Sequence, residues 1–507
     1  MKKLISFFTL VSVLCIISCS DEFTTNEAQN VESLDTFFLE ESNVEQAVIG
    51  IYDLMQLNYG VDWNSAFFLK VLPGDDANCG GPNIDDQALL QVIDDYAAVS
   101  SSNGHIESIW NLYYRTIALS NVVIENLKDS NLSNKESAVA QAKFFRAWCY
   151  FELTTMFGDI PLRTTLPTTA EDFAIAKSPQ SDIYIQIESD LTDAISSLPN
   201  KSAVSDNFRI SSGAAEALMG KVLVFQERYA ESLPYFQSVI TNTAHDLEPD
   251  VNDVWSINKE FGIESLVEIG YISTSGSTWG NLEWGGRNEG NLHVQLMGPR
   301  EGVYDLTGTG LVEGWGFNVP TGKLVTAFEN AGDTKRKATT LITESELIAG
   351  GGAVLSIQWD YEKAIRVKYA TKAEDTSAGG DTPLNYGTNF RLFRYAEVLL
   401  LAAEAYNKVG GQDAAARTEL NKIRFRAGLA DVSTSLSGND LFEAIVNEKF
   451  LELAHEGQRF WDLVRWGKAS TELAGTGYTS TNDLFPIPIS EIDKNTLMTI
   501  DDQNPGY

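Results

Sequence analysis

SSGAAEALMGKVLVFQERYAESLPYFQSVI, residues 211–240, is the stretch that says most about the fold of this chain. Its small, large, small, aromatic and small positions are Gly220, Leu223, Ser232, Phe236 and Val239. Small residues allow two antiparallel helices to approach closely, and an aromatic ring between them fills the space that remains. The stretch therefore predicts a closely packed helical hairpin.

These offsets resemble those of a tetratricopeptide repeat, and other segments repeat the theme. Residues 395–428, YAEVLLLAAEAYNKVGGQDAAARTELNKIRFRAG, form a looser helix-turn-helix pattern that turns at Gly410 and Gly411. Helical apolar periodicity also marks residues 44–55, 110–124, 135–157 and 183–198. We expect a mainly α protein whose scaffold contains about four such helix pairs, built from residues of about 41–60, 105–240 and 390–470.

A different kind of segment interrupts the helices between about residues 270 and 385. Residues 276–322 contain twelve glycines, together with Trp279, Trp284 and Trp315, and show little helical periodicity. The flanking stretches ESLVEIGYIS (264–273) and AIRVKYA (364–370) resemble strands. Long irregular segments in compact proteins are usually functional or disordered, and the aromatic residues argue against disorder. The sequence predicts a loop-rich, partly β insertion that binds the ligand.

Composition excludes some classes of function. The 507 residues are 43% hydrophobic and carry a formal net charge of −33. Nucleic-acid binding requires a basic surface, and polyanionic ligands in general are disfavoured by this charge. The four histidines are far apart in sequence and none has metal-ligand spacing. We predict no metal site, no cofactor and no nucleic-acid partner.

The N-terminus has the pattern of a bacterial lipoprotein signal. Lys2 and Lys3 precede a short apolar run, which ends in Ile16-Ile17-Ser18-Cys19 and an acidic Ser-Asp-Glu sequence. We predict a signal peptide over residues 1–18, lipidation at Cys19, and an extended acidic tether to residue 40. An ordinary secretory signal is the alternative. Of the remaining cysteines, Cys149 is predicted to be a core residue, and a disulfide with Cys79 stays open.

The order of these pieces resembles the SusD/RagB family, which comprises outer-membrane glycan-binding lipoproteins of Bacteroidetes. The matching segments are residues 142–162, 217–236, 316–340, 390–411, 420–428, 445–468, 485–495 and 503–507. A departure is Asn447-Glu448-Lys449, because an Arg commonly follows this Glu in the family. The resemblance implies one SusD-like domain over 41–507. It also implies a surface lipoprotein of the outer membrane that delivers glycan to a SusC-like TonB-dependent transporter.

Residues 452–467 contain charged and aromatic side chains that could form a catalytic cluster. The charged residues at helical spacing are Glu448, Glu452, Glu456, Arg459, Asp462 and Arg465. Opposite charges three or four residues apart can pair along a helix, and the resemblance implies that this segment is structural. We therefore predict an ion-paired seam in the scaffold, and no catalytic residues.

A glycan site needs an aromatic platform for the apolar sugar face and polar side chains for the hydroxyls. The candidate residues are Trp63, Asn64, Asp75, Asp76, Asn78, Trp279, Trp284, Arg287, Asn288, Glu289 and Trp315. We expect two of the four tryptophans to contact glycan. By contrast, Trp110, Trp148, Trp461 and Trp466 lie in helical patterns that predict core positions. Asp76-x-Asn78-x-Gly80 resembles part of a calcium loop, but ordinary turn chemistry explains it better.

The favoured function is non-catalytic capture of a neutral glycan, such as a laminarin-type β-glucan. A peptide-import lipoprotein of the same family is the first alternative. The second is a surface glycoside hydrolase, which would need two carboxylates at a defined separation, and no motif singles out such a pair.

Overall fold

The computed structural model describes residues 34–507 except 61–62, 170, 281–287 and 378. The fold is mainly helical, with 53% helix and 8% strand, which confirms the predicted class. The signal sequence, Cys19, Trp284 and Arg287 lie outside the described residues. The prediction of an extended tether as far as residue 40 is wrong at its C-terminal end. Leu34–Phe37 forms helix α2, and Phe38 is 5% exposed in the main core. Apolar residues at 34, 37 and 38 explain this burial.

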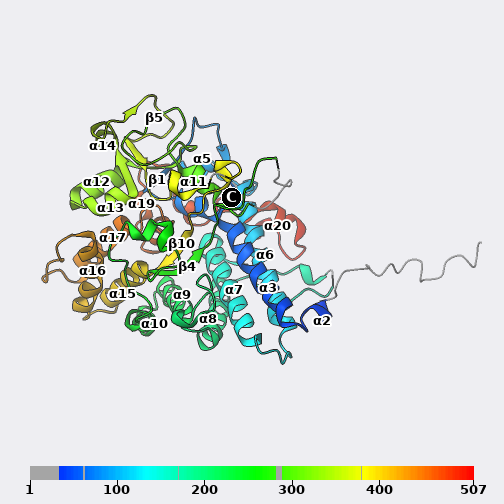
Figure 1. Cartoon of the computed structure of the whole chain (residues 1–507). Helices are drawn as coiled ribbons and strands as arrows, with labels where there is room; N and C mark the ends of the chain where they lie inside the picture. The colour runs from blue at the N-terminus through cyan, green and yellow to red at the C-terminus, as the bar shows by residue number, and fades with distance from the viewer. Residues whose placement is uncertain (1–33, 61–62, 170, 281–287, 378) are drawn as a thin grey trace, which may run out of the picture.

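The long helices form the scaffold, in which helices next to each other in the series contact one another (Figure 1). They are α3 (Glu41–Gly60), α6 (Gly104–Asn126), α7 (Lys135–Phe157), α8 (Gln180–Ser197), α9 (Ser212–Phe225), α10 (Tyr229–Thr241), α15 (Tyr395–Val409), α16 (Asp413–Ala427) and α17 (Gly438–Glu452). Helices α9 with α10 and α15 with α16 are the two pairs that the sequence specified. Helices α3 with α6 and α7 with α8 also pack together, which agrees with a scaffold of about four pairs.

The α9–α10 pair shows why the opening stretch folds as it does. Gly220 faces the ring of Phe236, and a Cβ atom at this position would lie 2.4 Å from Phe236 Cε1. Phe236 is fully buried in the seam. Ser211 caps the start of α9 through its side-chain oxygen, which accepts a hydrogen bond from the Ala214 backbone N–H. The small residue and the cap together fix this hairpin.

The insertion lies on the opposite side of the molecule from α8–α10 (Figure 1). It contains more helix than its glycine content predicted, namely α11 (Leu292–Met297), α12 (Gly322–Ala331), α13 (Thr334–Thr340) and α14 (Glu344–Ala349). Shorter helices elsewhere are α4 (Ala66–Val71), α5 (Ala88–Asp94), α18 (Arg459–Arg465), α19 (Ala469–Glu472) and α20 (Ile489–Lys494). The predicted strands at 264–273 and 364–370 are confirmed as β4 (Ser265–Ile269) and β9 (Ala364–Arg366).

The described strands pair antiparallel in two-stranded sheets. β4 pairs with β10 (Phe390–Arg394), β9 with β7 (Leu341–Thr343), β5 (Tyr304–Asp305) with β8 (Ala353–Val354), and β2 (Ile160–Pro161) with β3 (Lys177–Ser178). β1 (Ala77–Gly80), where we expected only a turn, pairs with β6 (Phe317–Pro320). Gly80 has a φ of +75°, and a Cβ there would lie 2.5 Å from the Gly316 carbonyl oxygen. The glycines thus allow the early loop to pair with the insertion.

One buried apolar cluster includes residues from Phe38 to Met498, so segments near both ends of the described chain share a core. Trp110, Trp148 and Trp461 are buried in it as predicted, and Trp466 packs against it half-buried. Cys149 is a core residue, as predicted. Cys79 and Cys149 are both buried and free, so the disulfide that the sequence left open is not formed. Within the described ranges, no helix is long and apolar enough to cross a membrane.

Candidate functional site

Three tryptophans from distant parts of the sequence lie with their rings nearly parallel. The ring centroids of Trp63 and Trp315 are 6.0 Å apart with 21° between the planes. Those of Trp279 and Trp315 are 6.4 Å apart with an angle of 17°. These separations fall in the range of offset stacking between aromatic rings. We call Trp63, Trp315 and Trp279 the indole row; Trp279 is 53% exposed and the other two are half-buried.

Trp315, the central ring, is held by its backbone against α11. Its N–H donates to the Gln295 carbonyl at 2.8 Å, and the next N–H, of Gly316, donates to the Gly298 carbonyl at 2.8 Å. A Cβ at Gly314 would lie 2.6 Å from the Cα of Gly298. The glycines around Trp315 therefore permit a close backbone approach that fixes the ring.

The two outer rings are anchored from other segments. Trp63 lies before α4, and its ring contacts Phe317 edge-on at a centroid distance of 4.6 Å. The Trp279 N–H donates to Asp381 Oδ2 at 2.8 Å. Asp381 was absent from the predicted site. No sequence signal connects it to Trp279, because the two residues are 102 positions apart.

Three other described candidates, Asn64, Asn288 and Glu289, have different surroundings. Asn64 follows Trp63 in the chain, and its Oδ1 lies 2.9 Å from His105 Nδ1. Asn288 is 4% exposed, and its side chain closes a local turn through the backbone of Gly290. Glu289 is exposed. Of these three, Glu289 offers a freely accessible carboxylate for sugar hydroxyls.

Asp75 and Asp76 are buried, whereas side chains that bind a glycan at the surface would be exposed. Asp75 accepts hydrogen bonds from Arg459 Nε at 2.6 Å and Lys323 Nζ at 2.5 Å. Asp76 is 2% exposed, and its Oδ2 accepts from the His455 N–H at 2.6 Å. The Asn78 amide donates to Glu362 Oε1 at 2.9 Å. Structural pairing is the better interpretation of Asp75 and Asp76.

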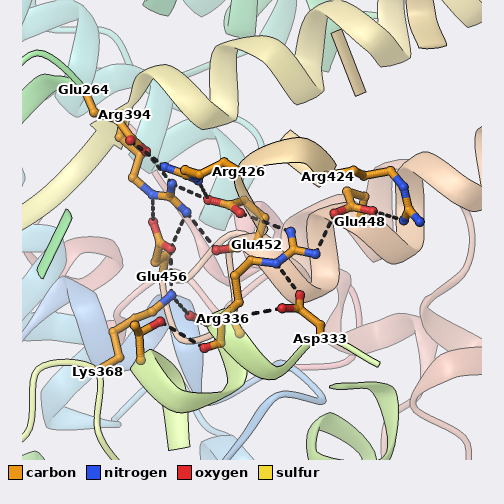
Figure 2. Close-up of polar contacts among 12 residues, drawn as sticks. Glu264, Asp333, Arg336, Lys368, Arg394, Arg424, Arg426, Glu448, Glu452 and Glu456 are labelled. Atoms are coloured by element: carbon orange, nitrogen blue, oxygen red, sulfur yellow. Dashed lines mark hydrogen bonds and ion pairs between the residues drawn. The ribbon is translucent and has the colours of Figure 1, made fainter. Parts of the chain in front are cut away.

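The predicted ion-paired seam exists, but its partners differ from those expected along one helix. The helix stops after Glu452 and resumes at Arg459, so most charges pair across elements. Among the six charged residues predicted at helical spacing, the described contacts include one ion pair within a helix, between Asp462 and Arg465 at 2.7 Å. Figure 2 shows ten residues that we call the central charge cluster: Glu264, Asp333, Arg336, Lys368, Arg394, Arg424, Arg426, Glu448, Glu452 and Glu456. It contains five carboxylates and five cations.

Glu452 lies at the centre of this cluster. Its carboxylate pairs with Arg394 at 2.6 Å, with Arg336 at 3.1 Å and with Arg426. Burial alone would raise the pKa of Glu452, but the three guanidinium groups outweigh it and hold that pKa well below its ordinary value. A carboxylate that stays ionised in the interior is poorly suited to protonate a substrate as general acid. The geometry supports a structural role.

No cluster of three His, Cys, Asp or Glu residues in the described part of the chain has the arrangement to hold a metal ion. The features that could recognise a ligand are thus the indole row and the polar side chains around it. Parallel aromatic rings at a surface can stack against the C–H faces of a flat ligand, while neighbouring amides and carboxylates bind its hydroxyls.

Comparison with known proteins places this mainly helical chain in a family. The family model described as "SusD family" matches residues 272–507. A second model, "Starch-binding associating with outer membrane", matches residues 30–224. SusD-like protein P25 of Formosa agariphila is 25% identical over 541 residues, which cover 98% of this chain and 99% of that protein.

Solved structures extend the likeness to three dimensions. A laminarin binding SusD-like protein is 32% identical with a TM-score of 0.82, and the match covers 92% of this chain and all of the other. Surface glycan-binding protein A from Bacteroides fluxus is 26% identical with a TM-score of 0.78 over 92% of this chain and 100% of that one. The chain belongs to the SusD family.

Proposed function

We propose that this protein captures a neutral glycan at the cell surface without cleaving it and passes the glycan to a SusC-like TonB-dependent transporter. The observation that carries the proposal is the indole row. Three segments far apart in sequence converge to hold Trp63, Trp315 and Trp279 parallel, with Trp279 exposed. A tryptophan that served only to fill the core would be buried, whereas Trp279 is exposed.

A laminarin-type β-glucan is the ligand that we favour. Neutral glucose units present C–H faces to aromatic rings and hydroxyls to amides and carboxylates. The net charge of −33 disfavours alginate and sulfated polymers. A relative that is 32% identical is described as laminarin binding, which supports the same class of ligand here.

The proposal includes a lipid anchor at Cys19 that holds the protein at the outer face of the outer membrane. Support comes from the signal-like N-terminus and from the matching family description, which mentions association with the outer membrane. Acyl chains on one cysteine bind a bilayer through burial of their CH₂ groups, about 0.8 kcal/mol each.

Affinity electrophoresis of the protein lacking residues 1–19 tests the ligand. The gels would contain laminarin, mixed-linkage β-glucan, starch, xylan or alginate, with a peptide mixture tested separately. We expect retardation by a neutral β-glucan. Trp279→Ala should weaken binding about two- to tenfold, because stacking of a ring against a ligand ring contributes about 0.5–1.5 kcal/mol. Phe425→Ala, at an 81% exposed aromatic on α16, is the matched control.

Equal retardation of Trp279→Ala and the unaltered protein would remove the indole row from the proposal. Binding to peptides alone would favour the peptide-import alternative. Release of reducing sugar from a retained glucan would point to the glycoside hydrolase instead.

A further inference from the structure

A cleft of about 890 Å³ lies between α3 and β4, and none of the three tryptophans of the indole row lines it. Its volume is in the range of ligand-binding pockets. The walls come from α3, the short turn around residue 257, β4 and the residues that follow β4. Its far end includes Ile272, whose N–H donates to the Glu289 carbonyl at 2.8 Å. The cleft therefore adjoins the same insertion that carries Trp279.

Part of the cleft lining is apolar. The rings of Phe208, Phe261 and Tyr271 line it, together with Ile49 and Ile272. Ile49 is 39% exposed and Ile272 is 51% exposed. Exposed isoleucines at the mouth of a cleft lose contact with water when a ligand covers them, which favours binding.

The polar part of the lining has a consistent character. Carboxylates and amides line the cleft, namely Asp53, Glu260, Glu268, Glu289, Gln46, Gln56, Asn207 and Asn389, and its lining includes no Lys or Arg. Glu268 and Asn389 bond to each other, and Gln56 donates to the Gly270 carbonyl. Among the residues described, the side chains of Gln46, Asn207 and Glu289 have no hydrogen-bond or ion-pair partner. They remain free to bind a ligand.

Glu260 is a mostly buried carboxyl group in the lining of the cleft. Its Oε1 accepts a hydrogen bond from the Asn389 N–H at 2.8 Å, and its side chain is 17% exposed. Burial raises the pKa of Glu260 to about 7, although Arg391 opposes that shift. A carboxyl group in this state can both accept a hydrogen bond from a hydroxyl and donate one to it.

We infer that this cleft is a second sugar-binding site, which holds a neutral, hydroxyl-bearing segment of the glycan while the indole row binds another. The inference rests on the proposed function and adds a site to it. Arg391 pairs with Glu260 at 3.6 Å and with Glu268 at 3.7 Å, so two of the four carboxyl groups are compensated from outside the lining. The lining itself offers carboxyl groups and amides but no Lys or Arg to pair with an anionic sugar, and apolar walls beside free amides suit a neutral one.

The test separates the two sites by using different signals. Hydrogen–deuterium exchange of residues 257–272 would report on the cleft, and tryptophan fluorescence would report on the indole row, with laminarihexaose and laminarin as probes. Ile49→Arg places a bulky cation at the mouth of the cleft. Ile185→Arg, at a 67% exposed isoleucine on α8, is the matched control. A second variant, Gln46→Ala/Asn207→Ala, removes two free amides without adding bulk.

We expect laminarihexaose to slow exchange at 257–272 in the unaltered protein, in Ile185→Arg and in Trp279→Ala, but not in Ile49→Arg. Affinity for polymeric laminarin should fall at least fivefold in Ile49→Arg, because two linked contacts reinforce each other. The double variant should show an intermediate loss.

A fluorescence response with unchanged exchange at 257–272 would overturn the second site and leave the proposed function standing. Protection of 257–272 by trilysine but not by sugars would assign the cleft to a cationic ligand and overturn the inference. If neither signal responds to any glucan, both the second site and the proposed function fail.

Discussion

Asp75 and Asp76 are neighbours in the chain, but their carboxylates are held in opposite ways. Burial alone would raise the pKa of Asp75, yet Arg459 and Lys323 outweigh it and hold the pKa below its ordinary value. Burial raises the pKa of Asp76 to about 6, and the charge of Asp75 adds to the shift. Asp76 Oδ1 is buried without a hydrogen-bond partner in the described structure. Asp75 therefore favours the folded state when ionised, whereas ionised Asp76 opposes it.

Replacement of Asp76 by Asn should stabilise the protein at neutral pH. Because the folded-state pKa is about 6 and the ordinary value is 3.8, the folded state binds more protons between these pH values. Stability from this group then falls as pH rises from about 4 to 6. Asp76→Asn should raise the free energy of unfolding by on the order of 2 kcal/mol above pH 6 and change it little near pH 4. Urea unfolding at both pH values measures this.

Asp75→Asn is the matched control for that experiment and should have the opposite sign. It breaks a mostly buried ion pair, so we expect a loss of roughly 3 kcal/mol at pH 7. The loss should shrink as acid protonates Asp75 in the unaltered protein. Similar effects of both substitutions at pH 7 would contradict our description of the two carboxylates.

At the scale of residues, the sequence predicted the three described tryptophans of the row but not their supports. Glycine-rich surroundings and aromatic residues were sufficient to choose Trp279 and Trp315. Asp381 could not be chosen, because only the folded chain brings it to the Trp279 backbone. Asp75 and Asp76 were predicted as glycan-binding residues because carboxylates can bind sugar hydroxyls. The partners that bury them, Arg459 and His455, are remote in sequence.

Among the elements, the α9–α10 pair depends on the absence of a side chain at Gly220. Alanine is ordinarily favoured over glycine in a helix by about 1 kcal/mol. Here the new Cβ would overlap the buried Phe236 ring, and overpacking of a core costs about 1–3 kcal/mol. Gly220→Ala should therefore lower the free energy of unfolding, measured in urea, by up to about 2 kcal/mol after the gain in helix propensity is subtracted.

Gly50→Ala in α3 provides the comparison. A Cβ at Gly50 would lie 3.3 Å from the Leu119 methyl Cδ2, and that half-buried side chain can shift. This substitution should be neutral or stabilising. Stabilisation by Gly220→Ala as well would show that the seam tolerates a methyl group.

The repeat helices were predictable because apolar periodicity and turn glycines act within a few residues. The short helices of the insertion were harder to predict from the sequence. Helix α14 is six residues long and starts with a capping box at Thr343 and Glu346, a local signal that a search for long periodic patterns misses. Strand β1 required its partner β6, some 240 residues later, to form.

In the whole molecule, the central charge cluster joins the insertion to the scaffold. Asp333, Arg336 and Lys368 come from the insertion, whereas Arg394 and the residues from α16 and α17 come from the scaffold (Figure 2). The sequence predicted Glu448, Glu452 and Glu456 in a charged seam, but not Glu264, Asp333 or the basic partners. Arg394 and Glu452 are 58 positions apart, and Glu264 and Arg426 are 162 apart.

Glu452→Gln should destabilise the whole molecule. Removal of one charge from a buried ion-paired group leaves its partners uncompensated and costs about 3–5 kcal/mol. Glu346→Gln is the control, since Glu346 pairs with Lys337 at 2.8 Å but its side chain is 51% exposed, so a change within about 1 kcal/mol is expected. Chemical unfolding followed by circular dichroism compares the two. Equal losses would mean that the cluster contributes no more than an ordinary surface pair.

The same cluster bears on the fate of the protein after proteolytic damage. Leu355 and Ile357 are 63% and 74% exposed, and they lie between Arg336 and Lys368 in the chain. A protease that cuts beside Ile357 would separate these two residues covalently. Arg336 in the first fragment would still pair with Glu448 and Glu452 in the second, and Glu264 would still pair with Arg394 and Arg426. The nicked protein would therefore stay in one piece.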